Sequence, residues 1–311
     1  MEPIIEIRGL CKDFRVGFWR KRVRVLYPLD LTVNSGEIFG YLGPNGAGKT
    51  TTLKLLTGLI LPTAGSVKLL GHDLAEVAAK RQIGFLPEHP YFYDYLTGRE
   101  FLDLCGRLFS LAAPLRRERI ARLLRLTELQ TAADQQLRKY SKGMLQRLGL
   151  AQALINDPRL VILDEPMSGL DPLGRKAMRD IILQLKAEGR TVFFSSHILP
   201  DVEVLCDRVA ILAAGRLRDV GRLADILKTP TEDIELTLQR VPDRLLPVLQ
   251  ALAHAPLLYQ PGGVLVRLPD EARLDDALRA AMAAGAQVVS VAPLRQTLEE
   301  HFLREVQGVA Q

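Results

Sequence analysis

The chain has 311 residues, of which 48% are hydrophobic and 25% charged, and its formal net charge at neutral pH is +5. This composition is typical of a soluble globular protein of about two domains, and the basic excess is too small to identify a nucleic-acid or membrane ligand. The sequence has no run of eighteen apolar residues and no signal-peptide pattern, which predicts a cytosolic chain without a membrane span. Its three cysteines are widely separated and lack a C-x-x-C pattern, which argues against a disulfide framework or a zinc site.

Strand-like alternation at residues 4–8 and 31–42 predicts a hairpin or small sheet near the start of the chain. A basic run from Arg15 to Arg24 lies between these strands and contains Phe18 and Trp19. Two interpretations are open: a surface that contacts lipid headgroups or a partner, or a solvated hairpin tip. The sequence alone favours the solvated tip.

A glycine-rich segment from Gly43 to Thr50 reads GPNGAGKT and matches the phosphate-binding pattern G-x-x-x-x-G-K-T. It follows an apolar run at 37–42, which predicts a buried strand, and it precedes a predicted helix at 51–58. Backbone N–H groups of such a turn converge on phosphate, while Lys49 adds a positive charge and Thr50 a hydroxyl ligand for Mg²⁺. The segment therefore predicts a nucleoside triphosphate site.

Apolar residues recur at helical spacing over 97–129, and apolar strand candidates follow at 160–163, 192–194 and 209–212. Helical segments such as 176–188 separate these strands. Alternation of this kind predicts an α/β fold with a mainly parallel sheet.

Two acidic residues, Asp164 and Glu165, directly follow the strand at 160–163. Ligands of open α/β sheets bind at the carboxyl ends of the strands, so we expect Asp164 to hold Mg²⁺ directly or through water. Glu165 is then placed to polarise a water for attack on the γ-phosphate. His197 follows the strand at 191–194 at the same edge, and we expect it to act in the site as well.

The composition changes after about Leu227, where prolines become frequent and short strands and helices follow in the order βαββαβ. A last helix begins with Thr297-Leu298-Glu299-Glu300, a capping-box pattern. We interpret residues 230–311 as a separate small α/β domain.

Five motifs occur in one order along the chain: the phosphate loop, the helix start Ser141-Lys142-Gly143-Met144, the Asp-Glu strand end, the segment 168–171, and Ser195-Ser196-His197. This ordered set resembles the ATP-binding subunit of ABC transporters over roughly residues 4–225. The resemblance implies a P-loop ABC ATPase domain at 1–229 with a mainly parallel core sheet, an antiparallel β subdomain and a helical subdomain at about 90–158. The small domain at 230–311 would then be an accessory or regulatory domain.

The resemblance also implies roles for individual residues. Asp164 would support the metal, Glu165 would be the catalytic base, and His197 would sense the γ-phosphate. Ser141 and Gly143 match the signature that closes over ATP held by a second copy, so catalysis would need two copies. The nucleotide contacts of the phosphate loop would be Gly43, Pro44, Asn45, Gly46, Ala47, Gly48, Lys49, Thr50 and Thr51.

Phe14 matches the aromatic residue that stacks on adenine in this family, but a short insertion at 16–21 makes Phe18 and Trp19 alternatives. Glu88 stands where glutamine usually contacts the metal and the attacking water. A carboxylate can still bind Mg²⁺, although it adds charge.

Two residues of the signature also depart from the family pattern. Lys142 replaces a glycine and Met144 a glutamine. Lys142 is open to two interpretations: contact with nucleotide across a dimer, or exposure to solvent, which we favour slightly.

The segment 91–96 is rich in aromatic residues, which either form a contact surface or pack inside the helical subdomain. In similar proteins this segment receives a short helix of the membrane subunit. We therefore predict an ATPase that binds ATP and Mg²⁺, forms a homodimer and powers a membrane-embedded exporter from the cytoplasmic face of the plasma membrane. The alternative is a soluble ABC-type ATPase that acts on nucleic acid or ribosomes; the modest basic excess argues against nucleic acid. A small GTPase or kinase is disfavoured because the guanine motif Asn-Lys-x-Asp is absent.

Overall fold

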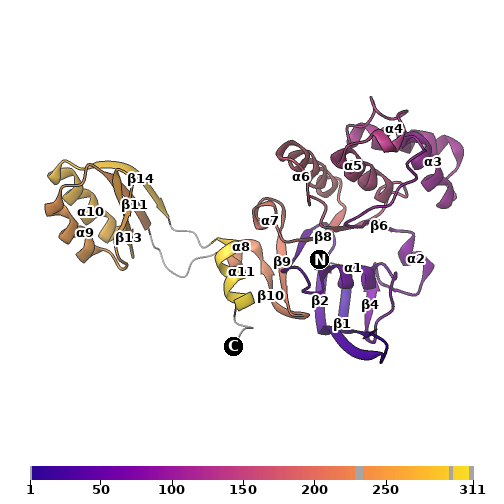
Figure 1. The fold of residues 1–311 in the computed structure, drawn as a ribbon, viewed down its shortest axis with the longest axis horizontal. Helices are drawn as coiled ribbons and strands as arrows, with labels where there is room; N and C mark the ends of the chain where they lie inside the picture. Colours follow the sequence, from indigo (N-terminus) through magenta and orange to yellow (C-terminus); the bar gives the residue numbers. More distant parts are fainter. Residues whose placement is uncertain (1, 228–233, 294–296, 308–311) are drawn as a thin grey trace. The chain divides into compact units, whose positions relative to one another are not determined.

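A computed structural model describes residues 2–227, 234–293 and 297–307. The chain forms two compact units: Met1–Leu223 together with the chain from Phe302 onward, and Ala224–His301 (Figure 1). Helix α11 (Leu298–Gln307) therefore crosses the border between the units in sequence. The predicted domain division at residues 229 and 230 stays a prediction.

The larger unit contains a six-stranded sheet whose central strands run parallel. The carboxyl ends of parallel strands meet at one edge, and here Leu42 pairs with Ser196 while Asp164 pairs with Ser195. This register brings three distant motifs to the same edge. In spatial order the strands are β10 (Arg216–Arg222), which is antiparallel to its neighbour, β9 (Arg208–Ala213), β3 (Ile38–Leu42), β8 (Thr191–Ser196), β7 (Leu160–Asp164) and β6 (Ile83–Leu86).

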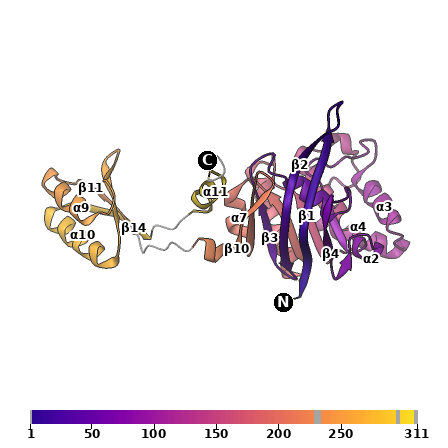
Figure 2. The same ribbon diagram turned by 90° about the horizontal axis from the view of Figure 1, so that it is seen from below.

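A second, antiparallel sheet packs beside the first and includes a long hairpin that extends beyond the rest of the unit (Figure 2). One hydrophobic core joins the two sheets and includes Leu29, Phe39, Leu53 and Phe193, all almost fully buried. The strands of this sheet, in spatial order, are β2 (Lys21–Asn34), β1 (Pro3–Val16), β4 (Ala64–Leu69) and β5 (His72–Asp73).

Helices α3, α4 and α5 pack on one another as the predicted helical subdomain (Figure 1). A capping box starts α3, since the side chains and backbone N–H groups of Thr97 and Glu100 bond reciprocally. Helix α5 also packs on β6, where a Cβ at Gly84 would meet the carbonyl oxygen of Ala153. The helices of this unit are α1 (Lys49–Leu56), α2 (Val77–Lys80), α3 (Gly98–Leu108), α4 (Ala113–Leu126), α5 (Lys142–Ala153), α6 (Pro172–Ala187) and α7 (Leu199–Leu205). The short α8 (Leu223–Ile226) begins at the last residue before the border between the units.

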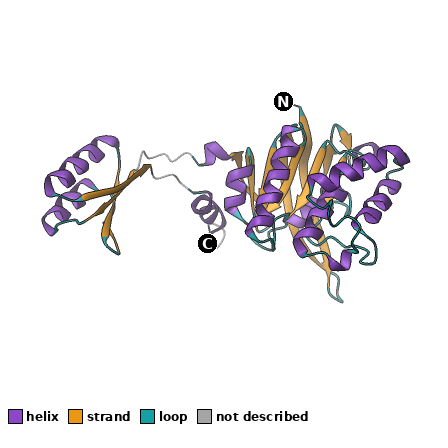
Figure 3. Cartoon of the chain, turned by 90° about the horizontal axis from the view of Figure 1, so that it is seen from above, coloured by secondary structure: helices purple, strands orange, loops and turns teal. Residues whose placement is uncertain are grey.

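The smaller unit has the predicted βαββαβ order and an antiparallel sheet with two helices on one face (Figure 3). Apolar residues alternate along its strands, and Leu236, Leu238 and Val266 pack against Leu249 and Ala277 of the helices. Its elements are β11 (Ile234–Gln239), α9 (Leu246–Leu252), β12 (Leu258–Gln260), β13 (Gly263–Leu268), α10 (Glu271–Ala284) and β14 (Gln287–Pro293), in the spatial order β12-β13-β11-β14.

The predicted α/β fold is confirmed in its layers and in its sequence of elements. The capping box predicted at the start of α11 is also present, because Thr297 and Glu300 bond each other's backbone N–H groups. Within the described residues, none of the helices combines the length and the apolar character that crossing a bilayer requires.

The core of the larger unit makes a direct prediction about stability. Phe193→Ala is expected to lower the free energy of unfolding by about 3–5 kcal/mol, because the buried ring stacks on Phe39 and contacts Tyr41. Urea unfolding followed by circular dichroism measures the change. Leu173→Ala, at a position 78% exposed, is the control. Equal, small effects of both substitutions would contradict this packing.

Candidate active site

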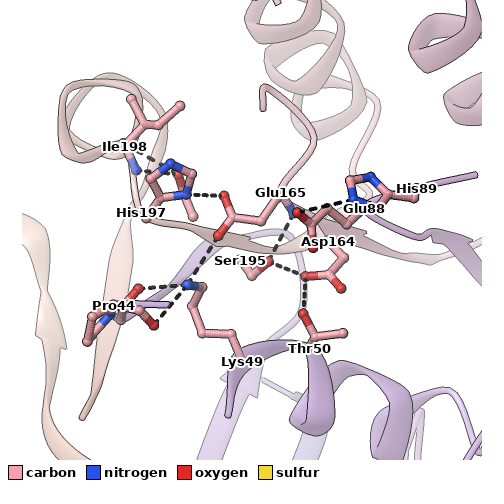
Figure 4. A network of polar contacts seen from close by, with 12 residues as sticks. Pro44, Lys49, Thr50, Glu88, His89, Asp164, Glu165, Ser195, His197 and Ile198 are labelled. Carbon is pink, nitrogen blue, oxygen red and sulfur yellow. Dashed lines mark hydrogen bonds and ion pairs between the residues drawn. The ribbon is translucent and has the colours of Figure 1, made fainter. Parts of the chain in front are cut away.

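The phosphate loop wraps around the side chain of Lys49, which is almost fully buried. Its ammonium donates hydrogen bonds to the carbonyl oxygens of Gly43 at 2.7 Å and Pro44 at 3.4 Å (Figure 4). Helix α1 begins directly after Gly48, whose φ of 107° lies in the left-handed region that favours glycine. The loop thus places a cation beside the free N–H groups of a helix start, an arrangement suited to phosphate.

Asp164 lies at the end of β7 and is 1% exposed. Its Oδ1 accepts hydrogen bonds from the hydroxyl of Ser195 at 2.7 Å and from the hydroxyl of Thr50 at 3.3 Å (Figure 4). Burial raises the pKa of Asp164, the two hydrogen bonds lower it, and the nearby carboxylates of Glu88 and Glu165 raise it further. The net shift of the Asp164 pKa is upward, because burial outweighs the two hydrogen bonds.

Glu165 lies between two nitrogen donors, as Figure 4 shows. Its Oε1 is 3.2 Å from the Lys49 ammonium, and its Oε2 is 2.8 Å from Nδ1 of His197. Its backbone has a φ of 48°, a left-handed conformation that costs roughly 1 kcal/mol for a residue with a Cβ. The Ser195 hydroxyl accepts the Glu165 N–H at 3.0 Å, and the Glu165 carbonyl accepts the N–H of Ser168 at 3.1 Å. The surroundings therefore fix both the backbone and the carboxylate.

A cleft of about 610 Å³ opens at this edge of the sheet. Most of the residues predicted to bind nucleotide line it, and Asp164 does not. The predicted nucleotide contacts outside its lining are Phe14, Gly43, Ala47, Ser141 and Gly143. Gly43 and Asp164 instead accept hydrogen bonds from two residues that line the cleft, Lys49 and Thr50 respectively. The lining residues are Val25, Pro44, Asn45, Gly46, Gly48, Lys49, Thr50, Thr51, Glu88, Glu165, Ser168 and His197.

Phe14 is half-buried on β1, opposite Val23 of β2, and the Lys12 ammonium lies 5.0 Å from the centre of its ring. It does not line the cleft, whereas Val25 of β2 does. Phe18 and Trp19, the alternatives considered for adenine, are exposed at the end of the hairpin. The assignment of Phe14 to adenine stays a prediction.

Ser141 and Gly143 lie at the start of α5 in a second cleft of about 430 Å³, which is separate from the phosphate-loop cleft. The Ser141 hydroxyl caps the helix by accepting the N–H of Met144 at 3.2 Å. Lys142 is exposed, and its ammonium fills the space that a side chain at Gly169 would need. Within this chain, therefore, neither residue of the predicted signature reaches the cleft that holds Lys49.

Two residues that contact the acids or the residue after them were given no role of their own from the sequence, although Ser195 lies in one of the five motifs. Ser195 bonds both Asp164 and Glu165, and its position opposite Asp164 follows from the strand register. Gln146 is 5% exposed on α5, and its side-chain amide donates to the carbonyl of Pro166 at 3.2 Å. A glutamine among buried helix positions was the available signal, because a buried amide needs a partner.

The comparisons with known proteins agree with this geometry. A family model described as ABC transporter matches residues 26–168. An uncharacterized ABC transporter ATP-binding protein of Nostoc sp. is 48% identical to this chain over 98% of its length and 90% of the relative's own length. The chain belongs to the ABC transporter ATP-binding proteins. As a member of this family it is an ATPase, and the predicted ATP binding and enzyme class are confirmed.

Two further members of the ABC family are similar to the chain. The daunorubicin resistance ATP-binding protein DrrA3 of Streptomyces coeruleorubidus is 37% identical, over 90% of this chain and 90% of DrrA3. The structure of MJ0796, a bacterial ABC transporter cassette solved as a dimer, superposes with a TM-score of 0.65 at 25% identity. It covers 70% of this chain and 98% of that cassette.

The contact of Gln146 yields a prediction for this ABC ATPase. Gln146→Leu removes the donor to the Pro166 carbonyl, which directly follows Glu165, and should lower kcat roughly ten- to a hundredfold through misplacement of the carboxylate. The KM for ATP should stay within about threefold, because the phosphate loop is untouched. Steady-state ATPase kinetics measure both constants.

Gln152→Leu, at a half-buried position of the same helix, is the matched control. A folded Gln146→Leu protein with the kcat of the control would show that this hydrogen bond does not position Glu165.

Proposed function

We propose that the chain is the ATP-hydrolysing subunit of a membrane exporter and that its active site is completed by a second copy. The observation that carries the proposal is the separation of the two halves of the site. Lys49, Glu165 and His197 line one cleft, whereas Ser141 and Gly143 line another. A second copy that presents its Ser141 helix start to the first cleft would bring a hydroxyl and a helix N-terminus to the terminal phosphate. The dimeric cassette among the similar structures supports this arrangement.

The chemistry assigned to the cleft is hydrolysis of the γ-phosphate. Glu165 accepts a proton from a water molecule while the oxygen of that water bonds to the γ-phosphorus. The bond from the γ-phosphorus to the leaving oxygen of ADP breaks in the same step. Lys49 offsets the negative charge of the phosphates. Because its ammonium also contacts the Glu165 carboxylate, the base lies next to the position of the phosphate. His197 orients the Glu165 carboxylate from the other side.

Mg²⁺ fits the donors at this position, because the Thr50 hydroxyl and the Asp164 carboxylate are adjacent oxygen donors and Glu88 lines the same cleft. These three residues would hold the ion together with the nucleotide phosphates. When bound, Mg²⁺ supplies positive charge that neutralises the phosphates.

A groove on the helical subdomain supports a permease as the partner. It has a volume of about 870 Å³, and its first lining residue, Tyr93, follows Glu88 closely in the chain. Tyr93 and Tyr95 are 48% and 63% exposed at its wall, and aromatic residues of this kind are frequent anchors of interfaces. The groove suits a short helix of a membrane subunit and would hold the chain at the cytoplasmic face of the membrane. A similar protein of Burkholderia lata, the Nod factor export ATP-binding protein I, is 41% identical over 62% of this chain and supports export as the direction.

The role of Glu165 can be tested by a single isosteric change. Glu165→Gln should lower kcat at least a hundredfold while ATP still binds, since the amide cannot accept the proton. With ATP the variant should accumulate as a dimer, which light scattering detects. Glu118→Gln, at an exposed position of α4, is the control. A variant that remains monomeric at saturating ATP would contradict the shared site.

The association with a permease is tested by co-purification in detergent from cells that express the chain with its membrane partner. Tyr93→Ser with Tyr95→Ser should abolish recovery of an integral membrane protein and leave basal ATPase activity unchanged. Tyr91→Ser is the matched control, because Tyr91 is 92% exposed but does not line the groove. Recovery of no membrane protein by the unmodified chain, together with salt-sensitive nucleic-acid binding, would favour the alternative function instead.

A further inference from the structure

The end of the β1–β2 hairpin carries the most exposed aromatic pair described in the larger unit. Phe18 and Trp19 are 93% and 89% exposed, and their ring centres are 5.7 Å apart in an edge-to-face arrangement. The hairpin of β1 and β2 extends beyond the body of the unit (Figure 2), and Phe18 and Trp19 lie in the turn that joins these two strands. Exposed aromatic side chains on an ordered projection indicate a contact surface.

The backbone at this tip is an ordered turn. Val16 pairs with Lys21, and the N–H of Arg20 donates to the carbonyl of Gly17 at 3.0 Å. Phe18 and Trp19 occupy the two central positions, where small polar residues and glycine are usual. Arg20 has a φ of 46°, a left-handed conformation that is unfavourable for a residue with a Cβ. The turn therefore holds residues that local stability does not favour, which is typical of functional positions.

Positive charges surround the two rings. Residues 14–24 include five cations and no acid. Asp13 pairs with Arg22 at 3.2 Å and Arg24 at 2.8 Å, so these two cations are neutralised in part. Within the part of the chain that the structure describes, the other three have no ion-pair partner. These three are Arg15, Arg20 and Lys21.

We propose that this hairpin tip docks on an anionic phospholipid surface, with Phe18 and Trp19 in the headgroup region and Arg15, Arg20 and Lys21 on lipid phosphates. Aromatic rings are favoured at the membrane–water interface, and flanking arginine and lysine side chains reach back to the headgroups. Each cation near an anionic leaflet adds to the electrostatic attraction. The contact goes beyond the proposed function, because lipid docking at this tip needs no permease.

Two other occupants fit the tip less well. The rings stand at 87° to each other, so they offer no parallel faces for successive bases of a nucleic acid. An adenine ring would have to lie in the phosphate-loop cleft, where Val25 of the hairpin is a wall but Phe18 and Trp19 are not. An exposed aromatic tip with flanking cations instead matches a soft, anionic and extended surface.

Trp19 is the only tryptophan of the chain, so the fluorescence of the intact protein reports on this tip alone. Vesicles of phosphatidylglycerol and phosphatidylcholine should shift its emission to shorter wavelength. Binding to them should be on the order of tenfold or more stronger than binding to pure phosphatidylcholine vesicles. Added salt should weaken binding, because it screens the exposed cations.

Arg20→Glu with Lys21→Glu should abolish the spectral shift and co-sedimentation with the anionic vesicles while ATPase activity stays unchanged. The charge-matched control is Arg125→Glu with Arg279→Glu, two exposed cations outside the hairpin, which should bind like the unmodified protein. Circular dichroism verifies that both variants are folded.

An unchanged Trp19 emission on anionic vesicles would overturn the proposal, as would equal binding to the neutral vesicles. Quenching of Trp19 by ATP, or by a single-stranded oligonucleotide, together with no response to vesicles would assign the tip to a nucleotide or a nucleic acid instead and would also overturn it.

Discussion

Two adjacent carboxylates are buried at the end of β7, and the rest of the active site depends on stabilising both. Asp164 and Glu165 are 1% and 6% exposed, a burial that is costly for charged groups without partners. Ser195 and Thr50 donate hydrogen bonds to Asp164, while Lys49 pairs with Glu165. The phosphate loop and the acids therefore depend on each other: Glu165 gives Lys49 a counter-charge in the protein, and Thr50 gives the buried Asp164 a hydrogen-bond donor.

The loop that follows Glu165 connects the two clefts of the chain, because Ser168 lines the first cleft and Gly169 lines the second. Gln146 on α5 bonds the carbonyl of Pro166, and Lys142 lies against Gly169 farther along the loop. The helix whose start carries Ser141 is thus bonded to the segment that directly follows Glu165, the proposed base. In the proposed dimer, ATP bound by one copy would touch α5 of the other, and these contacts would link that event to the second active site.

The sequence predicted the fold and the parts of the site that are continuous in the chain. The phosphate loop and the Asp164-Glu165 pair each carry their chemistry within a few residues and follow an apolar strand. Ser195 and Gln146 were missed because their roles arise from register and packing between segments 20 to 31 residues apart. For the hairpin tip the sequence left a contact surface open and favoured a solvated turn. It did not reveal that both aromatic side chains occupy the centre of a hydrogen-bonded turn.

Complementation between two defective copies tests the shared site most directly. Lys49→Ala disables the phosphate loop, and Gly143→Asp places a negative charge at the start of α5, where a Cβ meets only ordinary contacts. Each variant alone should be inactive. In an equal mixture about half of the dimers are mixed, and each mixed dimer retains one intact pairing of loop and signature out of two. The mixture should therefore recover roughly a quarter of the unmodified turnover. A mixture as inactive as either parent would contradict an active site built from two copies.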